Sequence, residues 1–409
     1  MSYKIERLDH QGRGITYING KIAFVKDTLP GEEIELKIIK ENSKLIEAEP
    51  TSFLKESQLR VKELCPYYKE CGGCNLLHMS YEEQIKYKQS KIVDIMKKYA
   101  DINGEVIKQI VPCDRQFHYR NKVTLKVKEK LGYFKEKTYE LIPIEKCLLV
   151  NDKINEIIKI LNGYTDLSNI KEVVIKSFTD KETMLIIYLQ EDEINENLLD
   201  YLSKHVDNII VYDNNKKMIK RIGKSNIIAR LMKKQFKIGA NSFFQVNMDQ
   251  TLKIYDKIAD YLSKIEDSTV LDLYCGVGSI GLYSVSNYAK LIGVEIVPEA
   301  IENAKTNAEL NSMENTKFLV GDTKTILMHS NYKADTIIVD PPRAGLDKSV
   351  IEDIKKINPN MLIYLSCDPI TLARDLKLLS DLYDVEELIP YDMFPNTHHV
   401  ETLVKLIKK

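Results

Sequence analysis

The second half of the chain alternates between strand-like and helix-like stretches, and this rhythm constrains the fold most. From about residue 248 onward, apolar runs of strand length are each followed by a segment of helical length; the runs are TVLDLYC, LIGVEIV, TKFLVGD, ADTIIVD and MLIYLSC. Strands that alternate with helices form a parallel sheet covered by helices, and ligands bind such sheets where the strands end. We therefore predict a doubly wound, Rossmann-like α/β domain with its site at the carboxyl ends of the strands.

The remainder of the chain is long enough for further domains, because 409 residues exceed what one hydrophobic core usually holds. Residues 1–57 contain short β-like runs separated by Gly and Pro turns, which predicts a small OB-like β-barrel, either a nucleic-acid platform or a plain spacer. Residues 80–100 have a Ser cap, early acids and late lysines, which predicts a helix. We predict three domains: 1–57, a mixed α+β domain at 58–240, and the α/β domain at 241–409.

Charge and hydropathy restrict the partners. Lys plus Arg number 59 against 60 Asp plus Glu, so a nucleic-acid surface must be a local patch, such as the basic run RLMKKQFKIG at 230–239. The first residues lack the apolar core of a signal peptide, and no apolar run approaches the length of a membrane span. We expect a cytoplasmic, monomeric protein with no membrane or DNA partner.

A glycine-rich turn between a strand and a helix predicts a cofactor site. In VLDLYCGVGSIG, residues 270–281, Gly276 lies where the backbone can approach a ligand, and Glu295 ends the next strand, where an acid can hold ribose hydroxyls. The spacing alone does not exclude NAD. DLYCGVG followed by an acidic strand end, by Gly321 and Asp322, and then by IIVDPPRAG resembles the methyltransferases that use S-adenosylmethionine, although DPPR alone is also compatible with a stiff turn.

Four cysteines have a spacing typical of a metal or cluster site. The segment CPYYKECGGC supplies Cys65, Cys71 and Cys74, and Cys147 follows far downstream. Thiolates gathered by a Gly-Gly turn hold zinc or an iron-sulfur cluster, and spacing does not separate the two. A thioredoxin-like motif is disfavoured because no βαβ unit begins there. We interpret Cys113 as structural or incidental.

The strand-like run MLIYLS ends in Cys367 and Asp368, just before a proline and a helix-like stretch. An isolated cysteine in this position is most often a buried structural residue.

The chain as a whole resembles the bacterial RNA (uracil-5-)-methyltransferases, and most of all the iron-sulfur-containing 23S ribosomal RNA enzymes of the RumA type. The resemblance lies in the cysteine spacing and in six motifs: HYRNKV, FFQVN, DLYCGVG, DPPRAG, LSCDP and HHVETL. The resemblance spans nearly the whole chain and implies that residues 1–57 are a TRAM domain. The family's transfer-RNA branch lacks the TRAM domain and the cluster, which favours a ribosomal RNA substrate.

The resemblance also implies the functional residues. Cys367 is implied as the nucleophile and Glu401, in HHVET, as the base. A [4Fe-4S] cluster is implied on the four cysteines named above. The implied contacts to S-adenosylmethionine are Gln245, Tyr274, Gly276, Glu295, Asp322 (to the adenine) and Asp340, and the implied contacts to RNA are Arg120, Phe243 (to the base) and Asp340 (to the uracil edge).

This chemistry explains why a thiol and a carboxylate are needed. C5 of uracil is a poor nucleophile, but thiolate attack at C6 gives an enolate whose C5 accepts a methyl group, and a carboxylate then removes the C5 proton. The base must leave its stack for a side chain to reach C6. Three alternatives stay open: a transfer-RNA uridine methyltransferase, a methyltransferase for exocyclic nitrogens, which needs no thiol, and a non-catalytic RNA-binding or iron-sulfur sensor protein.

Overall fold

The computed structural model describes residues 1–409 except 137, 180–181, 264–267, 288 and 329–331. The chain forms two compact units: Met1–Lys91, Tyr133–Ile142 and Phe394–His399 make up the first, and Ile92–Gly132, Pro143–Met393 and Val400–Lys409 the second. The predicted helix at 80–100 is confirmed as α1 (Tyr81–Ala100), with acids in its first turn and lysines in its last. No described helix is both long and apolar enough to cross a bilayer.

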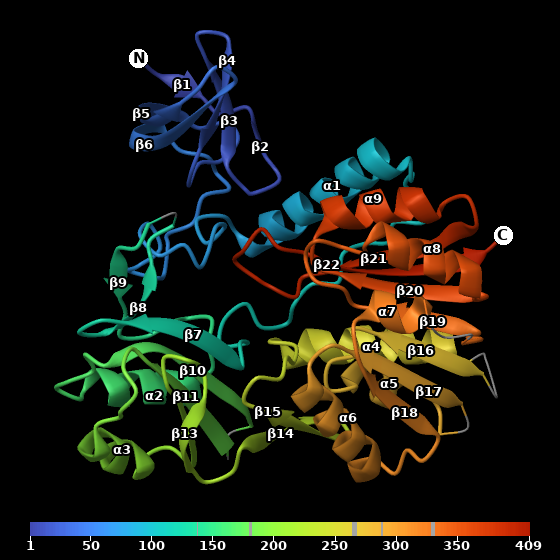
Figure 1. Cartoon of the computed structure of the whole chain (residues 1–409). Coiled ribbons are helices and arrows are strands. Elements are labelled where there is room, and N and C mark those ends of the chain that lie inside the picture. The colour runs from blue at the N-terminus through green and yellow to red at the C-terminus, as the bar shows by residue number, and fades with distance from the viewer. Residues whose placement is uncertain (137, 180–181, 264–267, 288, 329–331) are drawn as a thin grey trace. The chain divides into compact units, whose positions relative to one another are not determined.

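A curled sheet forms the N-terminal part of the first unit (Figure 1). Its strand order is β1-β5-β6-β4-β3-β2. The strands are β1 (Tyr3–Lys4), β2 (Arg7–Leu8), β3 (Gly14–Ile18), β4 (Lys21–Val25), β5 (Glu33–Glu41) and β6 (Leu45–Lys55). Tyr3 pairs with Ile34 of β5, whereas Arg7 pairs with Ile15 of β3. The segment of residues 3–8 thus bonds to both sides of the sheet and closes it into a small barrel, as the sequence predicted.

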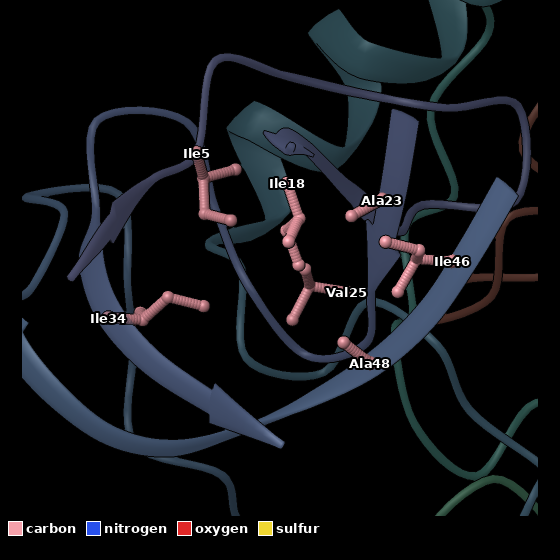
Figure 2. Close-up of a cluster of buried hydrophobic side chains, with 7 residues drawn as sticks. All are labelled: Ile5, Ile18, Ala23, Val25, Ile34, Ile46 and Ala48. Atoms are coloured by element: carbon pink, nitrogen blue, oxygen red, sulfur yellow. The ribbon is translucent and has the colours of Figure 1, made fainter. Parts of the chain in front are cut away.

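The barrel is filled by small and β-branched side chains, as Figure 2 shows. Such residues pack well on pleated strands, and each large one buried contributes about 1.5–3 kcal/mol to folding. The cluster consists of Ile5, Ile18, Ala23, Val25, Ile34, Ile46 and Ala48.

The central sheet has the order β13-β12-β11-β10-β7-β8-β9, and it is antiparallel except for the pair β11 and β12. The strands are β7 (Lys122–Val127), β8 (Leu131–Phe134), β9 (Leu141–Pro143), β10 (Ile170–Thr179), β11 (Glu182–Leu189), β12 (Asn208–Tyr212) and β13 (Met218–Ile222). Helix α2 (Asp152–Asn162) precedes β10 in the chain, and helix α3 (Glu196–Ser203) connects β11 to β12. The basic run 230–239 falls in the hairpin of β14 (Asn226–Leu231) and β15 (Lys234–Gly239).

The predicted α/β domain has the strand order β18-β17-β16-β19-β20-β22-β21. Its strands are β16 (Thr269–Leu273), β17 (Lys290–Glu295), β18 (Thr316–Val320), β19 (Thr336–Val339), β20 (Met361–Ser366), β21 (Tyr383–Tyr391) and β22 (Glu401–Lys408). Its helices are α4 (Met248–Leu262), α5 (Ser279–Ser284), α6 (Pro298–Leu310), α7 (Thr323–Met328), α8 (Lys348–Ile357) and α9 (Pro369–Leu379) (Figure 1).

Strand β16 is the topological switch point of this sheet. It pairs in parallel with β17 on one side and with β19 on the other, so the chain winds outward in both directions from it. Strand β22 runs antiparallel to both of its neighbours, β20 and β21. Ligands of such sheets bind at the carboxyl ends of the strands beside the switch point, where the predicted residues cluster.

Candidate active site

Cys367 and Glu401 face each other across neighbouring strands. Ser366 of β20 pairs with Thr402 of β22 in antiparallel register, so one residue further Cys367 stands opposite Glu401. Side chains in such positions have Cβ atoms about 4.5–5.5 Å apart. The structure therefore brings together the predicted nucleophile and base, which lie far apart in the sequence.

Asp340 joins this pair from strand β19. Val339 lies beside Tyr364 in the parallel register, which places Asp340 beside Leu365. Because side chains alternate along a strand, Leu365 and Cys367 share one face of the sheet, and Asp340 lies on that face too. The amide of Gln245 donates a hydrogen bond to the Asp340 carboxylate at 3.4 Å.

The electrostatics of this cluster favour the neutral forms of its acids. Burial raises the pKa of Asp340 to about 7, and burial together with the charge of Asp340 raises the pKa of Glu401 well above its usual value. Burial, then the charges of Glu401 and Asp340, raise the pKa of Cys367 to about 12. Two carboxylates in a site of low dielectric resist ionising together, and both oppose the thiolate. In the free protein the Cys367 thiol is therefore protonated near neutral pH.

Arg343 is the functional residue that sequence reasoning missed. Its positive charge lowers the pKa of both Cys367 and Glu401, in opposition to burial. The sequence interpretation treats DPPR as a cofactor motif and gives its arginine no role. The signal was the lone cation directly after the two prolines, since a rigid turn at a strand end fixes where such a charge lies.

Helix α9 holds the loop that carries Arg343. Thr371 donates to the carbonyl of Arg343 at 3.0 Å, and Arg374 donates to the carbonyl of Ala344 at 2.9 Å. Buried Asp375 accepts hydrogen bonds from the Leu346 amide and the Tyr364 hydroxyl.

Gly345 is required in the same loop. Its backbone has a φ of +75°, and a Cβ there would lie 2.5 Å from an oxygen of Asp375. The helix that follows Cys367 thus holds the loop of the neighbouring cation, Arg343.

The turn after β16 fits the donor groups of S-adenosylmethionine. Asp272 is fully buried; its Oδ2 accepts from the Gly281 amide at 3.1 Å, and its Oδ1 has no hydrogen-bond partner in the described structure. Burial raises the pKa of Asp272 to about 7. Gly276 has a φ of +55°, and a Cβ there would meet no atom within 4 Å. An unsatisfied acceptor beside open backbone suits a ligand with hydroxyl and ammonium donors.

The other predicted cofactor residues surround this turn. Glu295 ends β17 and accepts hydrogen bonds from the Gly276 amide at 3.2 Å and the Val297 amide at 2.9 Å. Tyr274 is half-buried, with a left-handed φ of 62°, a strained conformation that clusters at functional sites. Asp322 is exposed and accepts from the Thr325 amide at 3.1 Å near the start of α7.

Phe243 lies on a loop that a buried lysine holds in place. Phe243 is 59% exposed, whereas the Lys176 side chain is 1% exposed. The Lys176 ammonium donates to the carbonyls of Gly239, Ala240 and Ser242 at 2.8–3.0 Å. Burial lowers the pKa of Lys176 to about 7, but three acceptors match the three N–H groups of the ammonium form. The exposed aromatic ring is therefore presented from a fixed loop.

Arg120 lies beside the same loop. It is half-buried and forms an isolated antiparallel bridge with Asn247, and the adjoining Asn121 amide donates to the carbonyl of Val246. The two predicted RNA contacts thus come from segments that are hydrogen-bonded to each other.

The four cysteines predicted to hold a cluster are half-buried thiols, and none of the seven cysteines, which all lie in the described part, forms a disulfide. Cys65, Cys71 and Cys74 lie on one turn-rich loop of the first unit, and Cys147 belongs to the second unit. Among the described residues, no group of three or more His, Cys, Asp or Glu side chains is arranged to hold a metal ion. The loop therefore does not present a preformed metal site, and the cluster stays a prediction.

Cys113 behaves as a structural residue, in line with its interpretation. It is buried, its thiol donates to the carbonyl of Arg115, and its sulfur accepts from Asn247. His398 bonds to Asn75 within the first unit.

Comparison with known proteins identifies the family. The family model described as tRNA (Uracil-5-)-methyltransferase matches residues 80–409, and the TRAM domain model matches residues 4–51. The chain belongs to the tRNA (uracil-5-)-methyltransferase family. It is an S-adenosylmethionine-dependent RNA methyltransferase of class I fold with an N-terminal TRAM domain, as the motifs predicted.

Relatives of this methyltransferase match along nearly their whole length. An uncharacterized RNA methyltransferase of Clostridium acetobutylicum is 36% identical, with 99% of this chain and 96% of the relative covered. One of Halalkalibacterium halodurans is 32% identical over 98% of this chain and 95% of the relative. The crystal structure of the tRNA (uracil-54, C5)-methyltransferase of Pyrococcus abyssi, in complex with S-adenosyl-L-homocysteine, is 27% identical with a TM-score of 0.82, and all of both chains is covered.

Proposed function

We propose that this enzyme methylates C5 of a uridine in 23S ribosomal RNA. The observation that carries the C5 chemistry is the register that sets the Cys367 thiol opposite the Glu401 carboxyl, with Asp340 on the same face of the sheet. The preference for 23S ribosomal RNA rests on the cysteine spacing and the resemblance that it supports. A thiol, a buried carboxyl and a methyl-donor turn at one edge of a sheet are what C5 methylation of uracil requires and what methylation of an exocyclic nitrogen does not.

In this proposal each residue performs one task. S-adenosylmethionine, when bound, supplies a methyl group on a positively charged sulfur. Phe243 stacks on the uracil outside its RNA stack, and Asp340 bonds the edge of the ring. The Cys367 thiol first loses its proton to solvent, and Arg343 favours the resulting thiolate. The thiolate then adds to C6, and the electron pair of the C5–C6 double bond moves through C4 to O4 as the enolate forms.

Glu401 completes the reaction. Once C5 carries the methyl group, the Glu401 carboxylate takes the C5 proton, the C5–C6 double bond forms again, and the Cys367 thiolate leaves. Glu401 must be ionised for this step, so it acts in the fraction of molecules in which it has lost its proton. In that form a carboxylate whose pKa burial has raised is a stronger base than an exposed one.

Transfer RNA is the alternative substrate, and a specific observation favours it. The Pyrococcus abyssi transfer-RNA enzyme is covered over its whole length by the whole of this chain, residues 1–57 included. The TRAM domain therefore gives no reason to prefer ribosomal RNA.

The experiment that tests both candidates offers unmodified 23S ribosomal RNA fragments and transfer RNA transcripts in separate reactions, and measures 5-methyluridine by nucleoside mass spectrometry. Transcripts with 5-fluorouridine add a covalent trap, because fluorine cannot leave as a proton. An adduct on Cys367 identifies both the nucleophile and the RNA. Absence of 5-methyluridine and of adduct with every RNA, at saturating methyl donor, contradicts the proposal.

We also propose that Cys65, Cys71, Cys74 and Cys147 hold a [4Fe-4S] cluster with a structural or RNA-orienting role. The support is their spacing and their half-buried thiols. Methyl transfer consumes no electrons, so no step above depends on the cluster. Iron, zinc and acid-labile sulfide analysis of protein purified without oxygen tests this proposal: zinc alone, or no metal in well-folded protein, contradicts it.

A further inference from the structure

A large cavity of the second unit has no role in the reaction described above. Its volume is about 1130 Å³, above the range of about 300–1,000 Å³ that is usual for small-molecule sites. It is lined by residues before β7, at the end of β10 and around β14. We propose that this cavity binds single-stranded RNA nucleotides that flank the methylated uridine, an inference that rests on the proposed function.

Asn121 supplies an unsatisfied acceptor in the wall of the cavity. The residue is 3% exposed, and its amide nitrogen donates to the carbonyl of Gln245 at 2.9 Å. That bond fixes the orientation of the side-chain amide, because only the nitrogen can donate. The remaining Oδ1 is buried and has no hydrogen-bond partner within the described ranges. A buried acceptor of this kind calls for a donor from a ligand, and ribose 2′-hydroxyls and base N–H groups are such donors.

Two weakly engaged cations are available in the cavity wall. Arg115 is paired with Asp249 at 2.8 Å, which leaves Lys224 and Arg230 beside two acids of the lining, Glu182 and Asp207. The Lys224 ammonium lies 3.4 Å from Glu182, with 71% of its side chain exposed, so this pair is weak. A phosphate group can therefore recruit the lysine at little cost.

An aromatic ring completes the set of groups that recognise single strands. Phe178 lines the cavity and is half-buried, and its ring packs edge-to-face on Phe244 with centroids 5.4 Å apart. Aromatic side chains stack on unpaired bases irrespective of sequence. The neighbour of Phe244 in the chain is Phe243, proposed above to stack on the target base.

Hydrogen bonds connect the cavity with the active site. Asn121 donates to the backbone of Gln245, and the side chain of Gln245 donates to Asp340. The wall of the cavity is thus two hydrogen bonds from the proposed uracil contact.

The test reverses two cations and compares a matched control. Lys224→Glu with Arg230→Glu changes the cavity, whereas Lys204→Glu with Lys217→Glu makes the same charge change at exposed lysines outside both the cavity lining and the basic run 230–239. Fluorescence polarisation with a short single-stranded RNA, titrated with salt, measures the affinity of each full-length protein. We expect the cavity variant to bind at least about tenfold more weakly, with a log–log salt slope smaller by about 1.4 for two lost phosphate contacts.

Controls separate this inference from the proposed function. The control variant should bind within about twofold of the wild type, and both variants should keep wild-type thermal unfolding and S-adenosylhomocysteine binding in a calorimeter. Unchanged RNA affinity in the cavity variant, or an equal loss in the control, overturns the inference even when 5-methyluridine forms. A selective loss in the cavity variant supports it even when the wild type forms no 5-methyluridine, in which case the proposed function alone fails.

Discussion

Glu401→Gln should separate thiolate addition and methyl transfer from the later removal of the C5 proton and release of the RNA. The substitution keeps the shape of a side chain that is 2% exposed and removes its ability to take a proton. Where Glu401 is ionised, its charge is the largest cause after burial that raises the pKa of Cys367, so the neutral Gln removes this opposition to the thiolate. We therefore expect Cys367 to add to C6 at least as readily as in the wild type, and only the release step to fail.

The size of the effect follows from the role of a general base. A positioned base contributes about 10²–10⁴ in rate, which corresponds to about 3–5.5 kcal/mol of the barrier. Turnover of the Glu401→Gln variant should fall by this factor, while a methylated RNA–protein adduct accumulates. The adduct stalls because the C5 proton has no acceptor opposite the thiol.

The assay is single turnover with radiolabelled methyl donor and unmodified uridine in the RNA. A denaturing gel separates free RNA from adduct, and peptide mass spectrometry identifies the attached residue. Glu386→Gln is the matched control, because Glu386 lies on neighbouring β21, is 53% exposed and pairs with Lys405. It should behave as the wild type.

Two results refute the reasoning. Turnover of Glu401→Gln near the wild-type rate shows that another group, such as Asp340, takes the proton. An adduct without the methyl label shows that Glu401 acts before methyl transfer rather than after it.

Three further predictions concern single residues. Arg343→Gln should shift the rising limb of the pH–rate profile to higher pH and lower the activity at neutral pH by roughly tenfold, because the charge of Arg343 lowers the pKa of Cys367. Arg343→Lys keeps the charge and should retain most of the activity. Asp272→Asn should stabilise the ligand-free protein at about pH 8 by up to about 4 kcal/mol in urea unfolding, with no gain at about pH 4. The sign follows because a folded pKa of about 7, above the unfolded 3.8, contributes stability that is lost as the pH rises through 7; an equal gain at both pH values would contradict it. Lys176→Met should leave three buried carbonyls without donors and lower the free energy of unfolding by about 3 kcal/mol or more. Because the loop of Phe243 loses its support, KM for RNA should rise more than KM for the methyl donor. An equal rise in both KM values would point to general unfolding instead.

The elements of the α/β domain and the helix at 80–100 were predictable because their patterns are local. Alternating apolar runs specify strands, and acids before lysines specify the direction of a helix dipole. The candidate residues Cys367 and Asp340 were recognisable for the same reason, since each directly follows an apolar run. The position of domain boundaries at 57 and 240 stays a prediction.

The sequence did not predict a role for Arg343, because its effect on the pKa of Cys367 depends on how close the two residues lie in the folded protein. Nothing in the chain near residue 343 indicates that Thr371 and Arg374 will hold its loop, or that its charge will act on a thiol 24 residues further along. Lys176 is similar: a lysine in an apolar strand gives no sign of the three carbonyls that surround it.

The sequence by itself determined the order of strands and helices, the glycine-rich turn and the family, because each is written in contiguous residues. Only the tertiary structure decided that Glu401, on the last strand, stands opposite Cys367 and near Asp340. The physical reason is that register between strands is set by pairing and burial across the whole sheet, and that removal of water by this packing is what shifts the pKa of every group at the site.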